Sequence, residues 1–140
     1  MSAWKIGAAC AVGMVLGAAA MAGAQDMLPQ PVGEVQGHPL ANIDLGKAFP
    51  ALNGYILHMG RITVPPGAGL PMHSHKYKPE VLYFLQGHIS GQTNGGKIVT
   101  YGPGDVLIED ETMNHTLVNQ GTETVVYLGA HVGPIPPAKP

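Results

Sequence analysis

From Tyr55 onward, hydrophobic residues fall in short runs that are separated by glycine, proline and asparagine. Several of these runs alternate apolar and polar positions, which is the side-chain period of an extended strand. No stretch beyond residue 24 sustains the helical period of about 3.6 residues. The pattern therefore predicts strands at 55–64, 70–75, 80–85, 88–93, 97–101, 106–109, 115–119 and 124–132.

The breaks between the runs are turn signals, among them Pro65-Pro66-Gly67, Asn94-Gly95-Gly96 and Gly102-Pro103-Gly104. An Asn-Gly pair between two β-rich runs predicts a tight hairpin. About eight short strands at this spacing are typical of an antiparallel sandwich or jelly roll. We therefore expect a single all-β domain over residues 55–132.

Both faces of the run 80–86 are apolar. Alternation places Glu80, Leu82 and Phe84 on one face and Val81, Tyr83 and Leu85 on the other. A strand with one side in water should have one polar face, so something must cover the second face. A partner subunit would do so, which predicts a homodimer, and an N-terminal arm folded over the sheet is the alternative.

The two ends of the chain differ from this body. Lys5 precedes an uncharged, small and apolar stretch at 6–21, and Ala22-Gly23-Ala24 has the small-x-small form that signal peptidase cleaves. We expect residues 1–24 to be a signal peptide cut after Ala24, and the mature protein to be periplasmic or secreted. An uncleaved membrane anchor is the alternative. Residues 25–54 are expected to form an irregular arm, and the Pro-rich tail 133–140 to be loose and unable to pair in a sheet.

Composition narrows the function. Cleavage would leave residues 25–140, enough for one core, and would remove Cys10, the only cysteine. The mature domain would then have neither a disulfide nor thiolate chemistry. Lys5 would leave as well, so the nine acidic residues would outnumber the remaining basic ones. This balance argues against a nucleic-acid partner, and nothing predicts membrane attachment after cleavage.

The candidate chemistry is concentrated between residues 67 and 87. His73 and His75 lie two apart on an extended segment, so their side chains share a face. Glu80 opens the next apolar run, and His115 opens a later one. Three imidazoles and one carboxylate suit a divalent transition metal. These four residues therefore form a candidate metal site.

Plainer explanations exist for each of them. A His-x-His pair can lie on the surface, and His115 alone would be an ordinary polar strand residue. A carboxylate that begins a buried strand needs a compensating charge, which Lys76 or Lys78 could supply through an ion pair.

Other polar residues also have plain explanations. The run Glu109-Asp110-Glu111 is typical of a solvated turn, although one member could act as a base at a pocket rim. His58 has inward parity, where a core histidine is commoner than a catalyst.

These spacings resemble the motifs of the cupin superfamily. Gly67, five residues, His73-x-His75, four residues, Glu80, six residues and Gly87 are similar to the complete first cupin motif, and Gly104, His115 and Asn119 are similar to the second. The resemblance covers about residues 55–132. The chain departs from the second motif in having Asp110 and Thr112 where proline and glycine are usual, which leaves the turn before His115 less rigidly specified.

The resemblance implies a double-stranded β-helix, or jelly-roll barrel, that holds one metal ion inside. It implies His73, His75, Glu80 and His115 as ligands, and Gly67, Gly87, Gly104 and Asn119 as turn formers. The ion could be zinc in a closed tetrahedral site, or iron, manganese or nickel with about two positions open to substrate or dioxygen.

The expected function is a metalloenzyme acting on a small oxygenated organic molecule. A dioxygenase-like oxidoreductase is favoured, and decarboxylases and isomerases also occur in the family that the chain resembles. The alternatives are a non-catalytic protein that binds a carboxylate or sugar through the metal, and a zinc-stabilised structural dimer, since a fold does not choose among functions.

Overall fold

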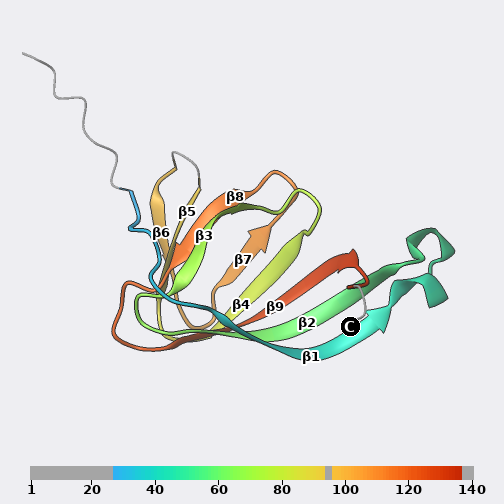
Figure 1. The fold of residues 1–140 in the computed structure, drawn as a ribbon, viewed down its shortest axis with the longest axis horizontal. Coiled ribbons are helices and arrows are strands. Elements are labelled where there is room, and N and C mark those ends of the chain that lie inside the picture. Colours follow the sequence, from blue (N-terminus) through green and yellow to red (C-terminus); the bar gives the residue numbers. More distant parts are fainter. Residues whose placement is uncertain (1–26, 94–95, 137–140) are drawn as a thin grey trace, which may run out of the picture.

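The computed structural model describes residues 27–93 and 96–136. The predicted signal peptide with its cleavage site, Cys10 and the end of the tail lie outside this range. The described chain is built mainly of strands in two antiparallel sheets that face each other (Figure 1). None of its helices has the length and hydrophobicity that a membrane span needs.

Nine strands make up the two sheets. The larger sheet has the order β1 (Gln36–Asp44), β2 (Tyr55–Val64), β9 (Val125–Pro134), β4 (Glu80–Gln86) and β7 (Val106–Glu109). The smaller sheet has the order β3 (Gly69–Ser74), β8 (Asn114–Val118), β5 (Ile89–Thr93) and β6 (Ile98–Tyr101). The chain crosses repeatedly between the sheets, and the predicted all-β jelly-roll fold is confirmed.

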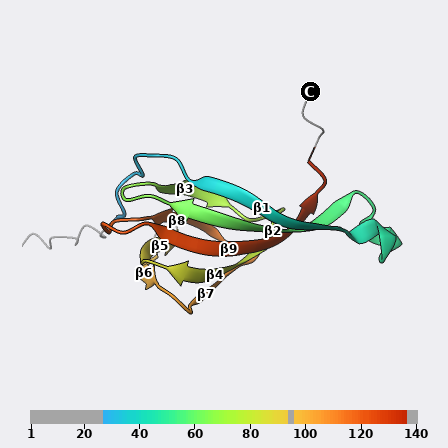
Figure 2. The same ribbon diagram turned by 90° about the horizontal axis from the view of Figure 1, so that it is seen from below.

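The N-terminal arm is more ordered than expected. Its residues Gln36–Asp44 form β1, which pairs with β2 along one edge of the larger sheet. Two 3-10 turns, η1 (Leu45–Lys47) and η2 (Pro50–Leu52), connect the two strands at the projecting end of this ribbon (Figure 2). The prediction of an irregular arm is therefore wrong for residues 36–44.

The tail also begins later than predicted. Gly133 and Pro134 belong to β9, and Pro134 lies opposite Tyr55 of β2. The expectation that no residue from 133 onward could pair in a sheet is wrong for these two. Proline lacks an N–H but can occupy the end of a strand, where no further ladder bond is needed.

The predicted turn formers hold the connections in place. Gly67, Gly87 and Gly104 have φ values of +77°, +69° and +92°, a region that side-chain-bearing residues rarely adopt. Asn119 is fully buried, and its amide donates to the backbone carbonyls of Val64 and Glu123. Asn119 thereby ties the end of β8 to the end of β2.

The hydrophobic core fills the space between the sheets around Phe84. Its ring lies 5.3 Å from that of Tyr127 and 5.4 Å from that of Tyr101, measured between centroids. Toward the start of β4 the inward positions run from Phe84 through Leu82 to Glu80. Polar side chains therefore begin where the apolar core ends, inside the same sandwich.

No residue of the described ranges covers the outward face of β4. Val81, Tyr83 and Leu85 are 47%, 46% and 45% exposed. Ile108 and Val106 of β7 pair with Val81 and Tyr83 and are also exposed, so the apolar surface continues onto the neighbouring strand.

The part of the N-terminal arm that the structure describes, from Met27 onward, does not provide the cover. Leu28 donates its N–H to the Gln92 side chain of β5, and Val32 donates to the carbonyl of Gly67. Strand β1 then follows the edge of the sheet that lies farthest from β4 and β7. The arm therefore leaves the outer face of β4 open, contrary to the alternative that it folds over that face.

Candidate metal centre

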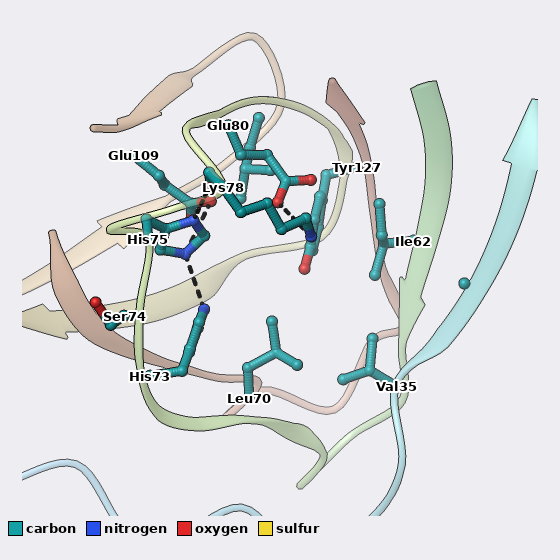
Figure 3. Close-up of a pocket in the computed structure, with 12 residues that line it drawn as sticks. Val35, Ile62, Leu70, His73, Ser74, His75, Lys78, Glu80, Glu109 and Tyr127 are labelled. Atoms are coloured by element: carbon teal, nitrogen blue, oxygen red, sulfur yellow. Dashed lines mark hydrogen bonds and ion pairs between the residues drawn. The ribbon is translucent and has the colours of Figure 1, made fainter. Parts of the chain in front are cut away.

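Three imidazoles meet between the two sheets. His73 on β3 lies opposite His115 on β8, and His75 follows the end of β3. The Nε2 atom of His75 is 2.9 Å from Nε2 of His73 and 3.1 Å from Nε2 of His115. The structure thus brings together the three histidines that the sequence singled out. Figure 3 shows two of them, His73 and His75, beside Glu109.

Backbone carbonyls fix the orientation of two of these rings. Nδ1 of His73 is 2.9 Å from the Pro71 oxygen, and Nδ1 of His75 is 3.0 Å from the Lys78 oxygen. A carbonyl can only accept, so each Nδ1 carries the hydrogen and donates it. With the hydrogen on Nδ1, the neutral form of such a ring points an Nε2 lone pair into the cluster. Two lone pairs this close repel unless a proton or a metal ion lies between them, and metal-bound histidines are commonly held by such partners.

The protonation of His73 favours metal binding. Burial lowers the pKa of this imidazole, and the nearby rings of His115 and His75 lower it further. The Pro71 hydrogen bond and the Glu109 charge act in the opposite direction without reversing the effect on the pKa. His73 is therefore neutral at neutral pH, which is the form that binds metals.

A buried carboxylate completes the cluster. Glu109 of β7 is 2% exposed, with Oε2 3.3 Å from Nε2 of His75 and Oε1 3.1 Å from Nε2 of His115. The sequence reading placed Glu109 in a solvated turn, which is wrong. Strand alternation was the available signal, since Leu107 and Glu109 point inward while Val106 and Ile108 point outward.

Glu80, the carboxylate that the sequence predicted as a ligand, lies beside the cluster. A carboxylate oxygen of Glu80 is within 4.8 Å of ligand atoms of His75 and Glu109. Its Oε2 is 3.0 Å from Nζ of Lys78, and its Oε1 is 3.6 Å from Nδ1 of His131. The ion pair weighed as an alternative for Glu80 is therefore present.

The cluster opens onto a cavity of about 270 Å³. Apolar side chains make one part of its wall, namely Val35, Ile62, Leu70 and Leu82. Lys78 and Tyr127 also line it, the former with half of its side chain exposed. Burial raises the pKa of the Tyr127 phenol, and the charges of Glu109 and Glu80 raise it further, so the hydroxyl stays protonated. This mixture is typical of small-molecule sites.

A second cavity of about 340 Å³ adjoins the first and shares Lys78 and Glu80 with it. The rings of His58 and His131 line it with their centroids 4.9 Å apart. Nδ1 of His58 is 2.7 Å from the side-chain oxygen of Asn42. His58 therefore lies on the inner side as predicted, but it faces this second cavity.

The donor atoms fit a single divalent ion. Ligands that bind one ion at about 2.0–2.2 Å lie about 2.8–3.1 Å apart at adjacent octahedral positions and about 3.3–3.6 Å apart in a tetrahedron. The separations from Nε2 of His75 to the other three groups are 2.9, 3.1 and 3.3 Å. Imidazole nitrogen and carboxylate oxygen together suit zinc, iron, manganese or nickel. The histidine and glutamate side chains are thus compatible with a metal site.

Comparison with known proteins agrees with this geometry. A family model described as a cupin domain matches residues 60–131, which include the three histidines and both glutamates. The chain belongs to this cupin family. Germin-like protein 1 of Brassica napus is 34% identical to this cupin over 77 residues, which are 52% of this chain and 37% of that protein. The oxalate-binding protein of Thermotoga maritima is 32% identical over 68 residues, 49% of this chain and 55% of that one. The cupin thus matches less than two thirds of the length of either relative.

Solved structures share the fold. A predicted oxalate decarboxylase from Thermotoga maritima superposes with a TM-score of 0.58 at 27% identity, covering 71% of this cupin and 81% of that chain. The cupin domain of Cnp3 from Schizosaccharomyces pombe gives the same TM-score at 19% identity, covering 71% and 61%. The second likeness supports the fold alone.

Proposed function

We propose that this cupin is an exported mononuclear metalloenzyme that acts on a small oxygenated carboxylic acid, with oxidation by dioxygen as the favoured reaction. The observation that carries the proposal is the convergence of three Nε2 atoms, two of them with fixed tautomers, at the wall of a cavity. Export is supported by the signal-like pattern of residues 1–24.

Each side chain at the cavity has a part in this proposal. His73, His75 and His115 hold the ion together with a carboxylate, and the bound ion would supply Lewis-acid or redox chemistry. The ammonium group of Lys78 lies at the cavity wall, where it can attract an anionic substrate. The protonated hydroxyl of Tyr127 can donate a hydrogen bond to a substrate oxygen, and the apolar wall excludes water.

The names of two relatives suggest the first compounds to test. One is called an oxalate-binding protein and another a predicted oxalate decarboxylase. Oxalate and other small dicarboxylates and hydroxy acids are therefore the first members of the panel. A cavity of about 270 Å³ has room for molecules of this size.

Metal analysis and turnover test the proposal together. Protein purified from its native compartment is expected to contain one equivalent of iron, manganese or nickel, and to consume oxygen with at least one member of the panel. His75→Ala should lose both the metal and the activity. A His75→Ala protein that still binds one equivalent of metal would contradict the site.

A binding protein without catalysis is the second candidate, and the relative named for oxalate binding favours it. Saturable, metal-dependent binding of a panel member without conversion would support it. A structural zinc site is the third candidate. A filled tetrahedral zinc in the purified protein would support that reading, whereas the cavity beside the histidines favours open coordination.

We also propose that the protein is a homodimer formed through the outer face of β4 and β7. This face is apolar, and the arm that could have covered it pairs along the opposite edge of the sheet. Exposed apolar patches of this kind commonly mark protein interfaces. A two-fold dimer would place the same strands of two copies against each other.

A further inference from the structure

We infer that Glu109, and not Glu80, is the carboxylate that binds the metal in this cupin. The inference rests on the proposed metal centre and assigns its fourth protein ligand. It departs from the pattern that the first sequence motif implies, in which Glu80 has that part.

The register of the larger sheet places the two glutamates next to each other. Glu80 of β4 and Glu109 of β7 are directly opposite each other in the ladder, and both point inward. Like charges at opposed positions destabilise a sheet, and burial increases the cost. Each carboxylate therefore needs its own cation.

Glu80 already has a cationic partner in Lys78, and a ring nitrogen of His131 lies near its other oxygen. Lys78 Nζ lies 3.0 Å from Oε2, and Nδ1 of His131, on the neighbouring strand, lies 3.6 Å from Oε1. The position is also shaped for the carboxylate, because a Cβ atom added at Gly129 would lie 2.5 Å from Oε1. Glu80 is therefore held over Gly129 by groups that are not part of the histidine cluster.

Glu109 has no such partner. In residues 27–93 and 96–136, its ion pairs are with His75 and His115, and none is with a lysine or arginine. One carboxylate oxygen lies 3.3 Å from Nε2 of His75, and the other lies 3.1 Å from Nε2 of His115. A carboxylate that is 2% exposed and has no lysine or arginine partner among the described residues needs a compensating charge. A divalent ion among the Nε2 atoms supplies the missing charge.

The assignment also gives Glu80 a different part. Because both cavities share Glu80 and Lys78, this ion pair lies between the histidine cluster and the second chamber, which His58 and His131 line. Glu80 would then contact the small molecule that binds beside the metal, and its ion pair with Lys78 would fix its position.

Metal titration of amide variants separates the two glutamates. Metal-free wild type, Glu109→Gln and Glu80→Gln are titrated with Co²⁺, followed by calorimetry and by the visible spectrum of the bound ion. Glu109→Gln should weaken binding by at least about 100-fold, because loss of outer partners alone commonly costs 10–100-fold. Glu80→Gln should retain the affinity within about fivefold and keep the wild-type spectrum.

Two results would overturn the assignment: loss of Co²⁺ binding in Glu80→Gln, or wild-type binding in Glu109→Gln. If Glu109→Gln fails to fold, as circular dichroism would show, Glu80→Gln still decides, because an unchanged affinity and spectrum support the assignment and a changed spectrum refutes it. His75→Ala serves as the reference. If it binds Co²⁺ like the wild type, the metal centre itself is wrong, which is a different failure from an exchange of carboxylates.

Discussion

At the level of single residues, Asp110 and Thr112 fix the backbone of the turn before His115, where the second cupin motif usually has proline and glycine. The carboxylate of Asp110 accepts hydrogen bonds from the Thr112 N–H at 2.9 Å and from its hydroxyl at 2.6 Å. The Met113 N–H donates to the carbonyl of Asp110. The absence of proline and glycine here therefore does not leave the turn loose, as the sequence suggested, because an aspartate-centred turn takes their place.

Replacing Thr112 by valine should loosen this turn and raise the pKa of Asp110. The Thr112 hydroxyl is the main cause of the lowered pKa, since it stabilises the ionised carboxylate. A lowered pKa contributes stability above the ordinary pKa of aspartate, and this contribution is lost as the pH falls through the lowered value. NMR titration of the Asp110 carboxyl carbon measures the change. Thr112→Ser keeps the hydroxyl and should keep the pKa, and an Asp110 pKa in Thr112→Val that equals that of the wild type would contradict this account.

Gly129 is predicted to be needed for the placement of Glu80. In Gly129→Ala, the new methyl group would meet Oε1 of Glu80 at 2.5 Å and Cδ1 of Ile62 at 3.2 Å. Overpacking of this kind costs about 1–3 kcal/mol, which denaturant unfolding can measure.

Gly133 in the same strand provides the control, because a methyl group there would make only an ordinary contact with His131 at 3.5 Å. Gly133→Ala should change the free energy of unfolding by less than about 0.5 kcal/mol. Equal losses in the two variants would show that the space over Gly129 is not the cause.

Residue by residue, the sequence identified the histidines but misjudged the carboxylates. His73 and His75 were found because strand alternation fixes which face a side chain occupies, and His115 because it opens a later strand and matches the second cupin motif. Glu109 was missed because it begins an acidic run whose other members, Asp110 and Glu111, are exposed. Alternation along 106–109 was the signal that could have placed Glu109 inward, and the ladder with β4 shows that it is the last inward position of β7.

At the level of elements, strands were predictable wherever turn residues bounded them. All eight predicted strands are present, and none of their ends differs from the prediction by more than two residues. Strand β1 was missed because Gly37 and Pro39 read as breakers. Pro39 lies next to a register irregularity on an edge strand, where a missing N–H costs no ladder bond. Sequence patterns do not show which strand will form an edge.

The outer face of β4 leads to a prediction about assembly. Val81→Lys places a charge in the centre of the proposed interface and should convert a dimer to a monomer, as sedimentation or light scattering would show. Val99→Lys on β6 is the matched control, because both valines are 47% exposed in the single chain. The control should leave the mass unchanged. A wild-type monomer at micromolar concentration would contradict the dimer proposal.

At the level of the whole molecule, the candidate site joins the two sheets. His73 and His115 lie on strands of the smaller sheet, whereas Glu109 and Glu80 belong to the larger one. The sequence motifs named most of these residues, but the way in which two sheets close on each other depends on packing that no local pattern records.

Metal removal is therefore expected to lower the stability of the entire domain. An ion that binds only the folded state, present at about 100 times its Kd, contributes about 2.7 kcal/mol. Chelation should lower Tm by several degrees, and added metal should restore it. His115→Ala should have a Tm that does not respond to either treatment. A wild-type Tm that is equally unresponsive would count against an ion between the sheets.

Strand β7 lies at the margin of its sheet, with β4 as its neighbour there. If the ion anchors Glu109, then a shortage of metal would let β7 detach and bare the hydrogen-bonding groups along β4. Bare strands of this kind invite pairing between molecules. Protein made in metal-poor medium should therefore precipitate or aggregate more readily than protein folded with its ion.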